Sequence, residues 1–147
     1  MAKKPKKSPA PATALDICNR ALALLQEPPI DRADSNGSPA ERSCYWYYHS
    51  TRREVLCTQE WPFATISASL LGGNGVFHLP DDCLRLLNVE ADGWLYSPPR
   101  TIVCHGKTAI NVTYTADCED VTRFSPDFIE AFVNALAVAL SKPLNIY

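Results

Sequence analysis

The sequence predicts an α+β fold, a bundle of about three helices with an antiparallel β-region inserted between the second helix and the third. Helix-like periodicity covers about 13–26, 39–60 and 126–141. From about 63 to 115 the apolar residues change to a period of two, which is typical of strands. A chain of 147 residues has the length of one domain, so we expect a single domain over 13–147.

The first helix, about 13–26, has a defined start and a defined end. Thr13 can cap its first turn, and Asp16 three residues later completes a capping box. Pro28 and Pro29 end the helix, because proline cannot continue the hydrogen-bond ladder. Its apolar face is predicted to comprise Ala14, Ile17, Cys18, Ala21, Leu24 and Leu25.

The second helix, about 39–60, follows a capping box of Ser38 and Glu41 and ends before Pro62. The face expected in the core carries Cys44, Tyr47, Tyr48, Thr51 and Val55. The opposite face carries Arg42, Trp46, His49 and Arg53. Trp and Arg are enriched in the hot spots of protein interfaces, so this second face is a candidate partner-binding surface. The alternative is a cation–π contact on a solvated surface.

The β-region is expected to be built from hairpins. The predicted extended segments are 63–71, 76–80, 84–90, 101–105 and 108–114. We expect the first two to pair through the glycine-rich turn at 71–75, and the last two to pair through Gly106 and Lys107. Apolar and polar residues alternate in the last segment, so one of its faces should be buried.

The last helix, about 126–141, is more apolar than a small domain normally needs. Ser125 can cap it, Pro126 suits its first position, and Pro143 ends the segment. Its polar side chains form one narrow stripe of Asp127, Glu130, Asn134 and Ser141. Two interpretations stay open: a central core helix of a monomer, or a helix shared between its own bundle and a subunit interface.

The net charge of −2 is unevenly distributed. Residues 1–12 combine lysines with prolines and alanines, which predicts an extended arm that needs a partner, such as a neighbouring subunit, to hold it. The lysines of this arm complete the candidate partner-binding set and are Lys3, Lys4, Lys6 and Lys7. The rest of the chain is acidic, which argues against broad and tight binding of nucleic acid.

No arrangement of residues in the sequence predicts catalysis. The six cysteines are widely spaced, without a Cys-x-x-Cys pair or a companion histidine at metal-ligand spacing, so we expect reduced structural thiols and no metal. A phosphate-binding loop and a nucleophile elbow are also absent, and we predict neither an enzyme nor a cofactor. No apolar run is long enough for a membrane span or a signal peptide, so we expect synthesis in the cytoplasm and no membrane partner.

The order of the segments resembles the head-to-tail adaptor family of short-tailed bacteriophages, also called the tail tubular protein A, gatekeeper or head–tail connector family. The similarity covers about residues 14–144. Its most specific elements are RREVL at 52–56 followed by WPFA at 61–64, LPDDCL at 79–84, and the Ser-Pro-x-Phe opening of the last helix at 125–128.

This resemblance implies a structural virion protein with no catalytic residues. About twelve copies would form a ring between the portal protein and the tail nozzle, a tail tubular protein B-like assembly, and would continue the DNA ejection channel. DNA would pass through the lumen without sequence-specific binding. The protein would be made in the host cytoplasm and located in the virion neck. The alternative is a small DNA-binding accessory protein that uses the basic N-terminal arm.

Overall fold

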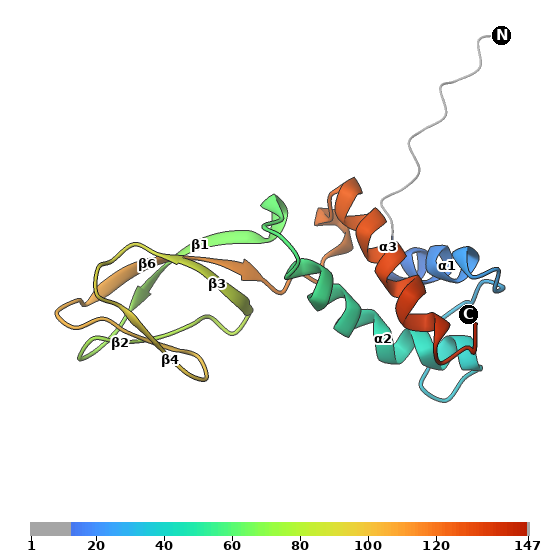
Figure 1. Cartoon of the computed structure of the whole chain (residues 1–147), viewed down its shortest axis with the longest axis horizontal. Helices are drawn as coiled ribbons and strands as arrows, with labels where there is room; N and C mark the ends of the chain where they lie inside the picture. The colour runs from blue at the N-terminus through green and yellow to red at the C-terminus, as the bar shows by residue number, and fades with distance from the viewer. Residues whose placement is uncertain (1–12, 147) are drawn as a thin grey trace, which may run out of the picture. The chain divides into compact units, whose positions relative to one another are not determined.

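The computed structural model describes residues 13–146, and the chain divides into two compact units. The helical unit runs up to Val55 and resumes at Glu119, and the β unit spans Leu56–Cys118. Three α-helices and two antiparallel three-stranded sheets make this an α+β fold, as the sequence predicts (Figure 1). The expectation of one domain over 13–147, made from the chain length, stays a prediction. The lysines of the arm lie outside the described residues.

The first helix, α1 (Ala14–Leu24), begins at the predicted capping box. The Asp16 amide donates to Thr13 Oγ1 over 3.1 Å, and the Thr13 amide donates to Asp16 Oδ2 over 3.1 Å. The helix ends two residues before the predicted position, and Gln26 beyond it has a φ of 60°. Its buried residues are Ile17, Cys18, Ala21 and Leu22, whereas Leu24, predicted on the apolar face, is exposed.

The second helix, α2 (Pro39–Leu56), also begins at its predicted capping box, in which the Glu41 amide donates to Ser38 Oγ over 3.3 Å. It is shorter than the predicted 39–60. Residues 57–60 instead form the turn that leads Trp61 into a short 3₁₀ helix, η1 (Pro62–Ala64). The predicted core face is confirmed at Cys44, Tyr48, Thr51 and Val55, which are all buried, but Tyr47 is exposed.

The third helix, α3 (Pro126–Ser141), has the predicted bounds and follows a 3₁₀ helix, η2 (Val121–Arg123). Ser125 occupies the N-cap position with extended backbone angles, but its side chain makes no capping hydrogen bond, so that expectation is wrong. The ring of Phe132 lies against Tyr48 of α2 at 5.0 Å and against Phe128 at 5.8 Å. These aromatic contacts join α2 and α3 in one core.

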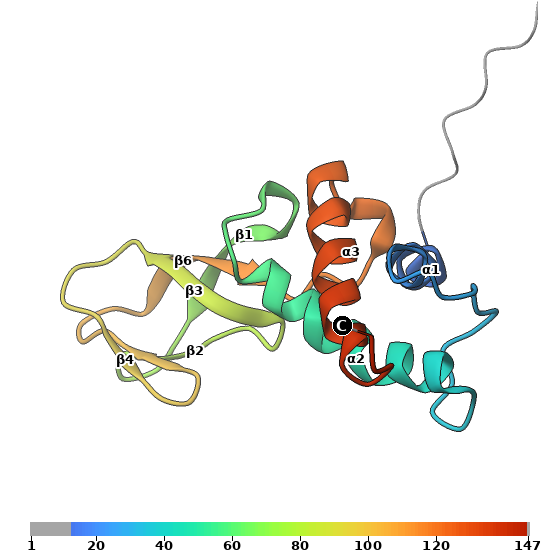
Figure 2. The same ribbon diagram turned by 45° about the vertical axis from the view of Figure 1, so that its right-hand side comes forward.

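The apolar excess of α3 is largely used inside the helical unit. Its buried side chains are Phe128, Phe132, Val133, Leu136, Ala137 and Leu140. The helix packs against α1 (Figure 2), and the Arg20 side chain of α1 forms an ion pair with Glu130. Val138, which is 74% exposed, is the large apolar side chain of α3 that stays uncovered among the described residues.

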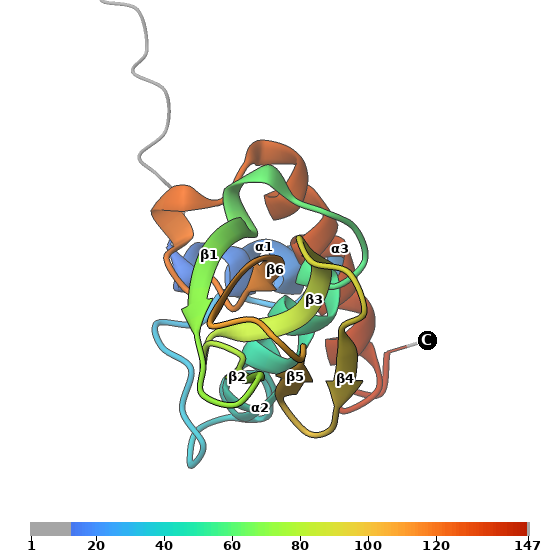
Figure 3. The same cartoon turned by 90° about the vertical axis from the view of Figure 1, so that its left-hand side faces the viewer.

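The β unit contains two sheets of strands that pair over long sequence distances. Its strands are β1 (Thr65–Leu71), β2 (Val76–His78), β3 (Cys83–Val89), β4 (Leu95–Ser97), β5 (Thr101–Val103) and β6 (Ala109–Ala116). One sheet has the order β1-β6-β3 and the other β2-β5-β4 (Figure 3). The two predicted hairpin ladders are therefore wrong, because β1 pairs with β6 and β2 pairs with β5.

A sharp corner replaces the first predicted hairpin. The β1–β6 ladder stops at the pair Leu71 and Ala109, and the β2–β5 ladder starts at Val76 and Val103. Gly72 lies between these two ladders, and a side chain at this position has no room. An added Cβ would lie 2.2 Å from the Val76 carbonyl oxygen. A glycine therefore lets the same chain leave one sheet and enter the other.

One apolar core unites the β unit. Its central members are Phe77, Leu79, Cys83, Val89, Ile102, Cys104, Ile110, Val112, Tyr114 and Ala116. The alternation predicted near the C-terminal end of the β-region is confirmed, because Ile110, Val112 and Tyr114 of β6 are all buried. The Tyr114 hydroxyl donates to Asp82 Oδ1 over 3.0 Å. Each sheet ends in two edge strands, and β3 and β4 are each one of them.

Candidate protein-binding surface

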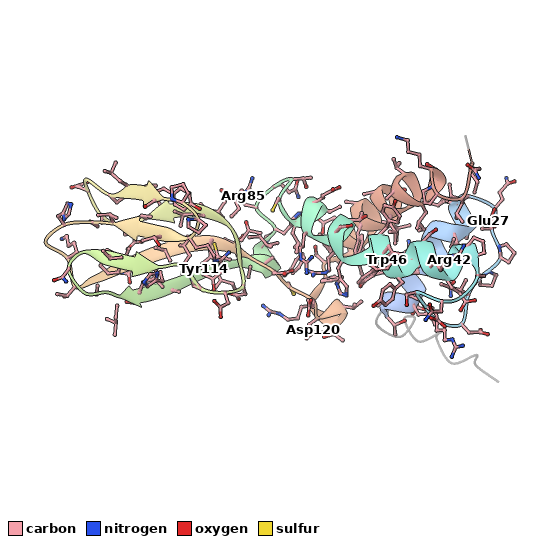
Figure 4. All side chains as sticks on the ribbon, turned by 90° about the horizontal axis from the view of Figure 1, so that it is seen from below. Glu27, Arg42, Trp46, Arg85, Tyr114 and Asp120 are labelled. Atoms are coloured by element: carbon pink, nitrogen blue, oxygen red, sulfur yellow. The ribbon has the colours of Figure 1, made fainter. Side chains whose placement is uncertain are left out.

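The predicted binding residues of the second helix all lie on exposed turns of α2. Arg42, Trp46, His49 and Arg53 follow one another at spacings of four, three and four residues, which keeps them on one side of the helix. Trp46 is 66% exposed and packs edge-to-face on Tyr45, with ring centroids 5.1 Å apart. Arg42 and Trp46 are labelled on α2 in Figure 4.

Two of these four residues, Trp46 and His49, also line a groove in the helical unit. The groove has a volume of about 740 Å³ and is called the Trp46 groove below. Its walls come from the start of α1, the loop after α1 and one side of α2. The lining residues are Ala14, Leu15, Cys18, Asp31, Arg32, Ala33, Cys44, Tyr45, Trp46, Tyr48, His49 and Glu119. Arg42 and Arg53 do not line it.

Tyr48 contributes a buried polar atom to the Trp46 groove. The residue is 7% exposed, and its hydroxyl has no hydrogen-bond partner among the described residues. Burial raises the pKa of this hydroxyl to about 12, so it is neutral at physiological pH. A buried hydroxyl without a partner costs free energy.

Two buried thiols lie at the same groove. Cys18 of α1 and Cys44 of α2 both line it and are both almost fully buried. The hydrogen bond with Cys44, together with burial, raises the pKa of the Cys18 thiol, which therefore stays protonated. All six cysteines are free in the structure, and these two are small apolar side chains in the walls of the groove.

The sequence interpretation missed a buried arginine beneath this surface. Arg52 is fully buried and donates from Nε to His49 Nδ1 over 3.3 Å. Its Nη2 atom lies 3.4 Å from Glu119 Oε1, which is also 3.9 Å from His49 Nδ1. A buried guanidinium requires such partners, and they fix His49 at the rim of the groove.

The sequence contains a signal for two of the missed residues, Arg52 and Tyr45. Arg52 lies four residues after Tyr48 and three before Val55, so its helical position is on the core face. Tyr45 precedes Trp46 and is half-exposed beside it. Glu119 has no such signal, because it is brought to α2 from 67 residues away along the chain.

The groove combines apolar and aromatic lining residues with few charged ones. Within residues 13–146, no three His, Cys, Asp or Glu side chains are grouped so that they could hold a metal ion. In the same part of the chain, no helix is long and apolar enough to cross a membrane. Apolar walls with few polar groups are typical of binding sites, and aromatic side chains such as Trp46 are enriched in protein interfaces. In comparisons with known proteins, no protein-family model and no curated protein matches the chain.

Proposed function

We propose that the chain is a structural virion protein, a head-to-tail adaptor of a short-tailed bacteriophage. About twelve copies would form a ring between the portal protein and the tail nozzle. The three helices would form the bundle of such an adaptor, with the β unit as its insertion. DNA would pass through the lumen without sequence-specific binding. The protein would be made in the host cytoplasm and would act in the virion neck, without catalysis, cofactor or membrane.

The Trp46 groove is the observation that carries this proposal. A tryptophan that is 66% exposed lines it, and so does Tyr48, whose buried hydroxyl has no partner among the described residues. Exposed apolar surface favours a protein partner, and so does a buried polar atom without a hydrogen-bond partner. Trp and Arg side chains in the centre of an interface carry much of its binding free energy.

A ring subunit needs two different surfaces, because head-to-tail contacts join unlike faces of neighbouring copies. The Trp46 groove supplies one of them. Large exposed apolar side chains elsewhere in the helical unit, Leu24 of α1 and Val138 of α3, are candidates for the other. We assign the portal and the nozzle as partners from the sequence resemblance over about residues 14–144.

The test compares assembly of the full chain with that of two variants. Native mass spectrometry and electron microscopy would be recorded for the chain alone and for the chain co-expressed with portal protein. We expect a closed ring of about twelve copies on the portal. Trp46→Ala should keep the fold and weaken ring or portal binding by about 2 kcal/mol, which is roughly 30-fold.

Tyr47→Ala is the matched control, since Tyr47 is an exposed aromatic residue of the same helix that does not line the groove. It should assemble like the wild type. A stable dimer, or a monomer on the outside of the capsid, would reject the adaptor. Retention on DNA that requires the arm lysines, without any ring, would favour the DNA-binding accessory protein instead.

A further inference from the structure

A second hollow lies in the β unit, between the free edges of its two sheets. It has a volume of about 420 Å³ and is called the Arg85 hollow below. Residues of β3 and of the segment before it form one side. Residues of β4 and of the segments directly before and after it form the other. The lining residues are Leu79, Cys83, Leu84, Arg85, Leu86, Trp94, Tyr96, Pro99 and Arg100. Among the described strands, β3 pairs only with β6 and β4 only with β5, so each has one edge without a strand partner.

Two arginines in this hollow have no carboxylate partner. Neither Arg85 nor Arg100 forms an ion pair within the described part of the chain, and the buried Nε of Arg85 donates no hydrogen bond. Arg100 donates from Nη1 to the Cys83 carbonyl oxygen over 3.3 Å, and from Nη2 to the Pro80 carbonyl oxygen. These bonds hold its guanidinium beside β3, and its charge stays uncompensated.

Arg85 and Arg100 are unusual because the β unit around them is acidic. The β unit has three basic residues, Arg85, Arg100 and Lys107, against six acidic ones. Two of the three basic side chains therefore line one hollow in a unit of net negative charge. A carboxylate of a short segment could lie beside the two guanidinium groups, whereas a long phosphate backbone would extend past them along a unit of net negative charge.

Aromatic side chains complete the hollow. Trp94 is half-buried, and Tyr96 of β4 is 48% exposed, with its hydroxyl donating to the Pro99 carbonyl oxygen. These rings and the leucines offer apolar contact on the same side as the arginines. An open strand edge presents backbone amide and carbonyl groups that an extended chain can pair with.

We propose that the Arg85 hollow binds an extended peptide segment of a partner protein, with acidic side chains alternating with apolar ones. The segment adds to the open edge of β3 or β4, and its carboxylates form charge-assisted hydrogen bonds with Arg85 and Arg100. The intervening side chains pack on Trp94 and Tyr96. Only residues of the β unit are used, so this proposal does not depend on the proposed function.

The experiment measures binding of random seven-residue peptides on an array by the full-length chain. We expect enrichment of sequences in which Asp or Glu alternates with apolar residues. Binding of an enriched peptide should fall about tenfold or more in Arg85→Gln, because a carboxylate–guanidinium hydrogen bond is among the stronger ones in proteins. Hydrogen exchange should slow in β3 or β4 when the peptide is added.

Lys107→Gln is the matched control, since it removes the third basic charge of the unit from an exposed position outside the hollow. It should bind the peptide like the wild type, and circular dichroism should show both variants folded. Equal binding by Arg85→Gln and the wild type would overturn the proposal, as would an array without acidic enrichment. Binding of an oligothymidylate through Arg85 in place of the peptide would identify a nucleic-acid site and overturn it too.

Discussion

Among residues 13–146 the two units each bury one tyrosine, and the hydroxyl groups of these two residues have different surroundings. In the β unit, Tyr114 is 4% exposed and donates to Asp82. In the helical unit, Tyr48 is 7% exposed and has no partner among the described residues. An unpaired buried hydroxyl costs about 1–3 kcal/mol. The β unit therefore satisfies this group internally, whereas the helical unit leaves it unpaired in a residue that lines a groove.

The charged groups show the reverse contrast. The helical unit encloses a complete guanidinium, Arg52, and compensates it through His49 and Glu119. In the β unit, the two arginines of the hollow stay at its surface, one half-buried and one exposed, without a carboxylate. A buried charge without partners is too costly to keep, so an uncompensated guanidinium is found only where water or a ligand reaches it.

The largest expected effect concerns the corner that gives the β unit its two sheets. Gly72→Ala should lower the free energy of unfolding of the β unit by about 3 kcal/mol, because its Cβ meets backbone that cannot move independently. Gly73→Ala is the control, since an added Cβ there meets nothing within 4 Å, and it should change stability by less than about 0.5 kcal/mol. Urea unfolding, monitored in each unit by hydrogen exchange, measures the stability changes of both variants. Equal stabilities would show that the corner is not constrained by Gly72.

The tyrosine pair should give effects of opposite sign. Tyr114→Phe loses the hydrogen bond to Asp82 and should destabilise the β unit by about 1 kcal/mol. Tyr48→Phe removes a hydroxyl without a partner and should leave the helical unit equally stable or stabilise it by up to about 1 kcal/mol. Chemical denaturation of the two variants checks this. A loss of stability in Tyr48→Phe comparable with that in Tyr114→Phe would mean that the Tyr48 hydroxyl is satisfied in solution.

The smallest effect is the pH dependence of the same two residues. Burial raises the pKa of both Tyr48 and Tyr114 from 10.0 to about 12. A group whose pKa is higher in the folded state stabilises fully below the pKa of the unfolded state, and this contribution is lost as pH rises through the folded pKa. Stability should therefore fall between about pH 10 and 12. Ultraviolet titration should show Tyr48 and Tyr114 ionising late, and each Phe variant should remove one late-ionising group.

The helices could be predicted from the sequence because their signals are local. The capping pairs Thr13 with Asp16 and Ser38 with Glu41 lie within four residues of each other, and both form as expected. The strand segments were also detectable, since alternation along β6 is a property of neighbouring residues. The pairing of these strands could not be predicted. Short turns such as 71–75 favour hairpins on local grounds, and the structure instead joins β1 to β6, whose pairs include Ile66 with Tyr114.

For the candidate sites, the sequence by itself determined that Arg42, Trp46, His49 and Arg53 share the exposed side of one helix, because helical spacing alone decides this. Only the tertiary structure decided that Trp46 and His49 border a groove and that Glu119 reaches Arg52. It also decided that Arg85 and Arg100 meet in one hollow between two strand edges. The physical reason is that a face depends on residues three or four apart, whereas a groove depends on which distant segments bury their apolar sides together.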